Sequence, residues 1–296
     1  MKMRKLMFVM ATIALLVLAG CAPVAQQAGE AAPTAPAAGE AAASNEGKPC
    51  SQVEVAAKDG AYDLGGCSMR IAVENAYQPF NFIDPDSKEA VGFDYDIFAE
   101  ICGRVNCKPE YIETSWDAMV AIMGGGGAME TFDVGADGIT ITEERAQHVD
   151  FSIPYISSKQ MLLVRADESR FANAAEFVAN AELKIGTQIG TTNYDAATEM
   201  LGSEDRIVAF DQFGPAVQAL MAGDVDAVMI DNVSGLGYVG ANPDKVKLTG
   251  DAIKVEELGF MFGKGSTLMA PVDATLEAMK SDGKLDEIYN KWFKTE

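Results

Sequence analysis

The feature that most constrains the fold is an alternation of strand-like and helix-like apolar patterns along most of the 296-residue chain. Residues 69–74 form an apolar run typical of a strand, and a stripe at near four-residue intervals from Phe93 to Val105 predicts a helix. A second unit follows: a strand over 110–112, a helical stripe over 116–123, and a strand over 132–136. Alternation of this kind predicts an α/β fold in which helices cover both faces of a mostly parallel sheet.

The pattern restarts after Arg165, which predicts a second α/β unit. Its strands are expected over 183–187, 207–210 and 225–230, and its helices from Tyr194 and over 213–221. The chain ends with a strand near 260–262, a helix past Pro271, and an amphipathic helix that carries Leu285, Ile288, Tyr289 and Trp292. No transmembrane span is predicted after the N-terminal segment.

Residues 1–20 have the pattern of an export signal. Lys2, Arg4 and Lys5 precede an apolar run over 6–19 that is too short to span a bilayer stably. The run ends in small residues followed by Cys21, which resembles the lipobox of bacterial lipoproteins. We therefore expect cleavage before Cys21 and lipidation of its sulfur; an ordinary secretory peptide followed by a chance cysteine is the alternative.

Residues 21–50 predict a disordered, lipid-anchored linker, because they hold almost no large apolar side chain to offset the entropy of ordering. Loss of Lys2, Arg4 and Lys5 with the signal leaves 20 of the 23 basic residues against 44 acidic ones, a formal charge of −24. Nucleic acid and anionic membrane surfaces are therefore excluded as partners, and contact with the membrane is expected only through the lipid anchor.

Four cysteines remain in the mature chain: Cys50, Cys67, Cys102 and Cys107. An even set in an exported protein predicts two disulfides. Pairing each cysteine with its neighbour in sequence is one of three possibilities. No metal site is predicted, because the spacing lacks the histidines that a zinc site would need.

Catalytic patterns find little support in this chain. His148 is the single histidine, and no Gly-x-Ser-x-Gly sequence occurs for it to serve. The glycines at 124–127 lack the Gly-Lys-Ser/Thr ending of a phosphate-binding loop, so they predict a flexible connection. We expect no catalytic residue and no cofactor.

The segment from Gly138 to Arg145 carries the strongest site pattern. Thr142 is placed to cap a helix start at the end of a predicted strand. Thr140 and Arg145 are then available for another role, and a hydroxyl beside a guanidinium at the carboxyl edge of a sheet suits a carboxylate ligand. Taken alone, Arg145 fits a surface helix residue equally well.

Seven segments in order resemble the polar amino acid-binding proteins that feed ABC importers, over residues from about 69 to 296. The segments are Glu74–Phe80, Gly92–Asp96, Gly138–Arg145, Val149–Tyr155, Gly190–Thr192, Asp226–Val228 and Glu287–Trp292. The resemblance implies a type II periplasmic-binding-protein fold, with hinge strands near 157–164 and 254–258. Lobe 1 would comprise residues 51–156 and 258–296, and lobe 2 would comprise residues 157–257 with the hinge strands.

The resemblance also implies how a free L-amino acid would be held between the lobes. It assigns residues to the ligand's α-carboxylate, to its α-ammonium group, and to aromatic walls around its side chain. These are, in that order, Arg145, Thr140 and Thr192; Asp231 with the carbonyl of Gly138; and Tyr77 with Trp116.

Two acidic residues indicate the charge of the ligand's side chain. Glu74 stands where many relatives have a shorter aspartate, and Asp137 stands where they commonly have a small residue. A carboxylate enclosed without a partner is costly, so a cationic ligand, arginine first, is expected. Gln188 and Asn193 would add amide contacts. Glutamine remains an alternative ligand, and Asp137 is alternatively directed to solvent or to a structural partner.

These features predict a monomeric receptor, not an enzyme, that delivers its ligand to the permease subunits of an ABC importer. It would lie outside the cytoplasmic membrane, in the periplasm or the extracellular space, anchored through Cys21. A ligand-sensing domain is disfavoured, because no signalling domain follows the last helix. An exported dehydratase-like enzyme on the same fold is the third possibility, with Glu74 as its acid or base.

Overall fold

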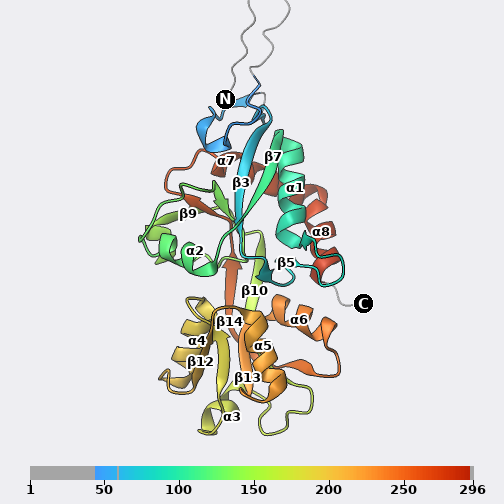
Figure 1. The fold of residues 1–296 in the computed structure, drawn as a ribbon. Coiled ribbons are helices and arrows are strands. Elements are labelled where there is room, and N and C mark those ends of the chain that lie inside the picture. The colour runs from blue at the N-terminus through green and yellow to red at the C-terminus, as the bar shows by residue number, and fades with distance from the viewer. Residues whose placement is uncertain (1–43, 59, 294–296) are drawn as a thin grey trace, which may run out of the picture. The chain divides into compact units, whose positions relative to one another are not determined.

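Two five-stranded sheets carry the fold of the computed structural model (Figure 1), which describes residues 44–58 and 60–293. The predicted signal peptide, the predicted lipidation site Cys21 and the predicted linker as far as residue 43 lie outside the described residues. Among the described residues, no helix has the length and apolar character needed to cross a membrane.

The first sheet has the strand order β7-β3-β8-β15-β9. Its strands are β3 (Cys67–Val73), β7 (Cys107–Glu113), β8 (Val134–Gly135), β9 (Val149–Phe151) and β15 (Met261–Gly263). The three strands β7, β3 and β8 are parallel, and β15 runs antiparallel to β8 and β9. We call the part of the protein built on this sheet lobe 1; it combines residues from the early chain with residues from its end.

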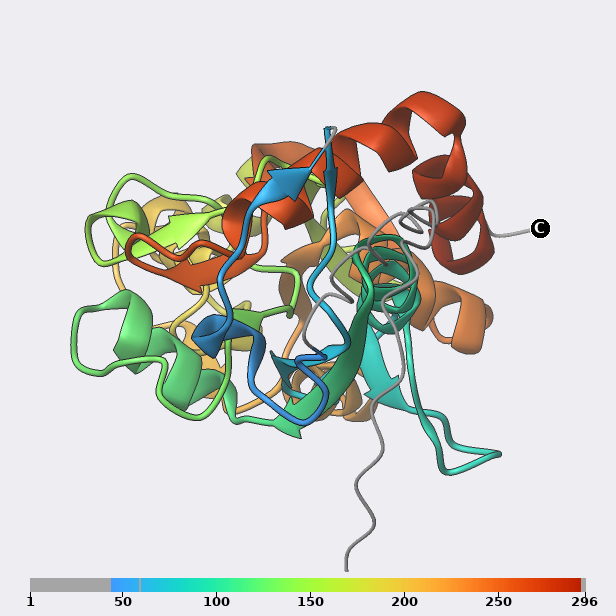
Figure 2. The ribbon, with the colours of Figure 1, turned by 90° about the horizontal axis from the view of Figure 1, so that it is seen from above.

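Helices cover both faces of the lobe 1 sheet, as the alternation predicts. Ile71 and Val73 in β3 pack into the core that contains α1 (Phe93–Val105), α7 (Met269–Asp282) and α8 (Lys284–Phe293). Ala72, which points the other way from the strand, packs into a separate core with α2 (Trp116–Met123). Figure 2 shows the red C-terminal helices beside α1 and away from α2.

The disulfides Cys50–Cys67 and Cys102–Cys107 join the sequence neighbours. The first bond links η1 (Cys50–Gln52) to the start of β3, and the second links the end of α1 to β7. The smaller strands of lobe 1 are β1 (Ala57–Lys58), β2 (Ala61–Tyr62), β4 (Ala76–Tyr77), β5 (Asn81–Ile83) and β6 (Ala90–Val91).

The chain is already structured within the last residues of the segment that was predicted to be linker, residues 21–50. The amide of Asn45 donates to the carbonyl of Gly65 at 2.8 Å, and the amide of Ser68 donates to the carbonyl of Lys48 at 2.8 Å. These contacts follow from the bond between Cys50 and Cys67, which holds the preceding residues against β3. Composition alone does not reveal a boundary that a disulfide sets.

The second sheet, with order β12-β11-β13-β10-β14, defines lobe 2. Its strands are β10 (Ile156–Arg165), β11 (Ile185–Gln188), β12 (Ile207–Phe210), β13 (Ala227–Asp231) and β14 (Val246–Leu258), and its helices are α3 (Ala174–Ala179), α4 (Thr192–Leu201), α5 (Phe213–Ala222) and α6 (Asn232–Ala241). Strands β12, β11 and β13 are parallel, but β10 is antiparallel to both of its neighbours. Each sheet is therefore parallel in one part and antiparallel in the other.

Strands β10 and β14 connect the two lobes. They pair antiparallel from Ile156, opposite Leu258, to Arg165, opposite Val246. The predicted hinge segments, 157–164 and 254–258, fall inside these two longer strands, which pass between the sheets in Figure 1. Two strands crossing side by side leave the lobes joined at one edge, so a cleft can open and close at the other.

Candidate functional site

Residues from both lobes line a small cavity of about 20 Å³. Its lining consists of Tyr77, Trp116, Asp137, Gly138, Thr140, Arg145, Gln188, Thr191, Thr192, Asn193, Phe213 and Asp231. All the residues that the sequence analysis assigned to the ligand are among them, except Glu74. The structure therefore brings together side chains that lie more than a hundred residues apart in the sequence.

The ends of the parallel strands explain this convergence. Gln188 and Asp231 are the last residues of β11 and β13 in lobe 2, while Asp137 follows β8 and Glu74 follows β3 in lobe 1. Ligands of α/β sheets bind beyond the carboxyl ends of the strands, where side chains meet without blocking backbone pairing. In this protein, the carboxyl ends of the parallel strands of lobe 1 face those of lobe 2.

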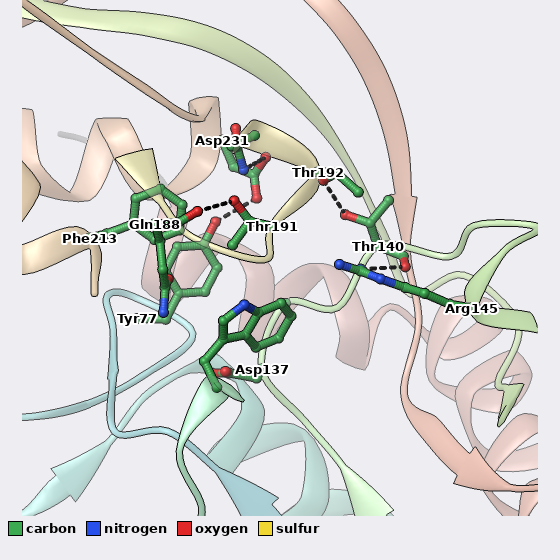
Figure 3. Close-up of a pocket in the computed structure, with 12 residues that line it drawn as sticks. Tyr77, Asp137, Thr140, Arg145, Gln188, Thr191, Thr192, Phe213 and Asp231 are labelled. Atoms are coloured by element: carbon green, nitrogen blue, oxygen red, sulfur yellow. Dashed lines mark hydrogen bonds between the residues drawn. The ribbon is translucent and has the colours of Figure 1, made fainter. Parts of the chain in front are cut away.

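Arg145 reaches the cavity from the turn that Thr142 stabilises. The Thr142 hydroxyl accepts from the Arg145 amide at 3.1 Å, as expected of a cap, but only a single 3-10 turn (η2, Arg145–Gln147) follows. The guanidinium donates from Nη1 to the carbonyl of Thr140 at 3.0 Å and lies 5.6 Å from the ring centre of Trp116 (Figure 3). It is therefore a cleft residue, not a surface helix residue.

Two threonine hydroxyls face each other across the lobes. The Oγ1 atoms of Thr140 in lobe 1 and Thr192 in lobe 2 are 3.2 Å apart (Figure 3). Thr192 is the first residue of α4, and the preceding Thr191 caps that helix by accepting from the amide of Tyr194 at 3.2 Å. A helix N-terminus carries a partial positive charge, so this side of the cavity favours an anionic group.

Asp231 forms the opposite pole of the cavity. The Tyr77 hydroxyl donates to its Oδ2 at 2.5 Å, and the Asn193 amide donates to Oδ1 at 3.4 Å. Burial nevertheless raises the pKa of Asp231 to about 6. Gly138 lies against the Tyr77 ring with φ of +57°, and a Cβ there would be 2.8 Å from the ring, so this close approach requires glycine.

Glu74 does not line the cavity; it lies directly behind Gln188, whose side-chain amide donates to Oε1 of Glu74 at 3.0 Å. Asp137 does line the cavity, and it accepts from the Asn81 amide at 2.7 Å. The same amide donates to Asp94 at 3.0 Å. Asp137 thus faces both the cavity and a structural partner, which combines two possibilities that the sequence analysis had kept apart.

Burial is the main cause of the pKa shifts of these acids. It raises the pKa of Glu74 to about 7 and that of Asp94 to about 7, despite the hydrogen bonds that both accept. Burial and the neighbouring Glu74 carboxylate raise the pKa of Asp137 well above its ordinary value. Each raised pKa means that the charged carboxylate is less stable here than in water.

Arg145 is the one basic side chain among the described residues that line the cavity. Burial lowers its pKa, and the nearby carboxylate of Glu256 acts in the opposite direction. The guanidinium stays charged, because its ordinary pKa lies far above neutral pH. The cavity therefore holds more acidic than basic groups.

Two lining residues were missed by the sequence analysis. Thr191 lies within the segment Gly190–Thr192, and its position before a helix is typical of a cap residue. Phe213 stacks on Tyr77 with ring centres 5.1 Å apart, but at the start of an amphipathic helix it has the pattern of a core residue. Tyr77 also stacks on Phe80, so part of the wall predicted for the ligand is covered by protein.

Comparison with known proteins agrees with this geometry. Residues 69–295 match the family described as bacterial extracellular solute-binding proteins, family 3. The chain is 29% identical over 227 residues to the L-cystine-binding protein TcyA of Bacillus subtilis (strain 168), covering 76% of this chain and 81% of that protein. It is 30% identical over 219 residues to the ABC transporter glutamine-binding protein GlnH of the same strain, covering 73% and 77%.

A solved structure shows the same architecture. The arginine-, lysine-, histidine-binding protein ArtJ from Geobacillus stearothermophilus matches with a TM-score of 0.69 at 33% identity, covering 77% of this chain and 96% of that chain. The chain belongs to the bacterial extracellular solute-binding proteins of family 3. It has the two-lobed type II periplasmic-binding-protein fold, and its relatives are binding proteins, not enzymes.

The raised pKa values predict how stability depends on pH. Glu74 moves from an ordinary pKa of 4.5 to about 7, so between these values the folded protein retains protons that the unfolded chain has released. The free energy of unfolding without ligand should therefore fall by roughly 1 to 3 kcal/mol between pH 5 and pH 8. Urea titrations at several pH values measure this, and a free energy that rises over the same interval would contradict it.

Proposed function

We propose that the protein captures a free L-amino acid between its lobes and delivers it to the permease of an ABC importer. Membership of the family supports capture of a solute outside the cytoplasm. The relatives named above carry cystine, glutamine, arginine, lysine and histidine in their names, which supports an amino acid as the solute. In this proposal the chain acts as a monomer tethered through a lipidated Cys21.

Recognition of the amino acid backbone rests on two opposed poles of the cavity. Arg145, the hydroxyls of Thr140 and Thr192, and the N-terminus of α4 would hold the α-carboxylate. Asp231, with the carbonyl of Gly138, would hold the α-ammonium group. Because these groups come from both lobes, a bound zwitterion interacts more strongly with the closed arrangement than with an open one and thus favours closure.

The excess of buried acid supports a cationic side chain, with arginine as the first choice. After Arg145 and Asp231 are paired with the ligand backbone, Glu74 and Asp137 remain enclosed without a basic partner in the described lining. A guanidinium would neutralise them, contact the aromatic side chains of the lining and donate several hydrogen bonds. The observation that carries this choice is the cavity-facing carboxylate of Asp137, backed by Glu74.

Glutamine is the second candidate, and one observation favours it. Glu74 already accepts from Gln188, and its pKa of about 7 permits a neutral carboxyl group near neutral pH. A protonated Glu74 would need no cationic partner, and an amide side chain would then be accommodated. The two ligands differ in what they require of Glu74, so this residue separates the two proposals.

The backbone-recognition scheme predicts large losses when either pole is removed. Arg145→Ala and Asp231→Ala should each weaken binding of every amino acid by about 2 to 5 kcal/mol, because each leaves one ligand charge unpaired in a closed cleft. Lys184→Ala and Asp224→Ala, which each remove one charge at an exposed position outside the cavity, serve as controls. Calorimetric titration showing nearly unchanged affinity for either cavity variant would refute the scheme.

The choice between arginine and glutamine predicts a selective effect at Glu74. Glu74→Gln should weaken arginine far more than glutamine and shrink the preference by roughly 1 to 3 kcal/mol, while its new carbonyl still accepts from Gln188. Glu113→Gln makes the same charge change at an exposed position on the neighbouring strand and should have little effect. Wild-type preference for glutamine, or an unchanged preference in Glu74→Gln, would exclude the cationic ligand while leaving the receptor proposal intact.

A further inference from the structure

A buried acid on a hinge strand approaches the cavity from behind the two threonines. Glu256 belongs to β14 and pairs with Ser158 of β10. Its side chain is only 3% exposed, although the neighbouring Val255 and Glu257 are exposed. The sequence analysis gave this residue no role, because a single glutamate in a hinge segment has no distinguishing pattern.

One oxygen of Glu256 accepts three hydrogen bonds from three parts of the protein. Oε2 accepts from the Thr192 hydroxyl at 2.8 Å, from the Thr140 hydroxyl at 3.0 Å and from the Gln160 amide at 3.2 Å. Thr140 lies in lobe 1, Thr192 lies in lobe 2, and Gln160 lies on the other hinge strand. The carboxylate therefore links both lobes in this closed arrangement.

Backbone pairing holds the strand that carries Glu256 beside the Thr140 segment. The segment around Thr140 lies along the end of β14, with Thr140 bridged to Leu258. The Ile141 amide donates to the carbonyl of Glu257 at 2.9 Å, and the Gly259 amide donates to the carbonyl of Ile139 at 2.9 Å. The backbone pairing therefore places Glu256 within reach of Thr140, and the rotamer of its side chain decides whether the two are hydrogen-bonded.

The contacts with Glu256 use the hydroxyl protons of Thr140 and Thr192. A threonine hydroxyl has one proton, so it donates one hydrogen bond at a time. While Thr140 and Thr192 both donate to Glu256, neither has a proton left for a ligand carboxylate. The hydroxyls assigned to the α-carboxylate are therefore already occupied by a carboxylate that belongs to the protein.

We propose that Glu256 is an internal competitor for the α-carboxylate subsite, which lowers amino acid affinity by occupying the hydroxyls of Thr140 and Thr192. The inference rests on the proposed function, since it assumes an amino acid with a free carboxylate. The incoming carboxylate displaces Glu256 from the two hydroxyls and takes its place beside Arg145. Lys254, whose ammonium nitrogen lies 3.4 Å from the other oxygen of Glu256, is placed to hold the displaced side chain.

Removal of the competing charge should tighten binding of ligands with an α-carboxylate. In calorimetric titrations, Glu256→Gln should lower the dissociation constant of L-arginine by roughly three- to tenfold. L-argininamide, which has no α-carboxylate, should gain clearly less. Glu257→Gln removes the same charge from the adjacent exposed position of the same strand and should leave both constants near those of wild type. L-glutamine and L-glutaminamide are the corresponding pair if the wild-type protein prefers glutamine.

Glu256→Ala is measured beside Glu256→Gln, and thermal unfolding of each variant confirms that it is folded. Tighter binding of the acid in both variants, without an equal gain for the amide, supports the competitor role. Unchanged or weaker binding of the acid overturns it, and an equal gain for acid and amide does so too. If the wild-type protein binds no amino acid in the same titrations, the proposed function itself fails, and the competitor role fails with it.

Discussion

The rest of the site depends on one constraint: several carboxylates are enclosed between the two lobes. The described residues that line the cavity include a single guanidinium. Taking a carboxylate out of water is costly unless a cation or several hydrogen bonds compensate. Asn81, Gln188 and Tyr77 provide such hydrogen bonds. These are neutral donors, and the raised pKa values of Glu74 and Asp231 show that the compensation is incomplete. In the proposed function, a cationic ligand would complete it.

The contacts across the cleft describe what a ligand must replace. Tyr77 in lobe 1 donates to Asp231 in lobe 2. The hydroxyls of Thr140 and Thr192 contact each other, and both donate to Glu256. Protein groups thus form hydrogen bonds with the side chains that are proposed to hold the ligand's ammonium and carboxylate groups. Net affinity is the difference between ligand contacts and these internal contacts, and in the proposed competitor role Glu256 would lower it.

The sequence predicts the fold through its strand-helix alternation, and most of the cavity lining through the resemblance of seven segments to the amino acid-binding family. Strand-helix alternation places Gln188 and Asp231 at strand ends, and the residue types from Gly138 to Arg145 favour a carboxylate-binding role. What could not be predicted depends on packing between distant segments. Phe213 has the pattern of a core residue until Tyr77 is placed against it, and Glu256 gains meaning only through the pairing of β14 with the Thr140 segment. The sequence likewise does not reveal that Glu74 lies behind Gln188, because periodicity does not indicate how far a side chain lies from the cavity.

The most direct test of the charge imbalance is to count the protons exchanged when the wild-type protein binds L-arginine. Calorimetric titrations at pH 6.5 in buffers of different ionisation enthalpy give this number. Glu74, with a pKa of about 7, should be largely protonated in the free protein, and a guanidinium in the adjoining cavity should favour its ionised form. The account predicts release of up to about one proton per arginine and much less with glutamine. Tight binding of arginine with no proton release, or with proton uptake, would contradict it.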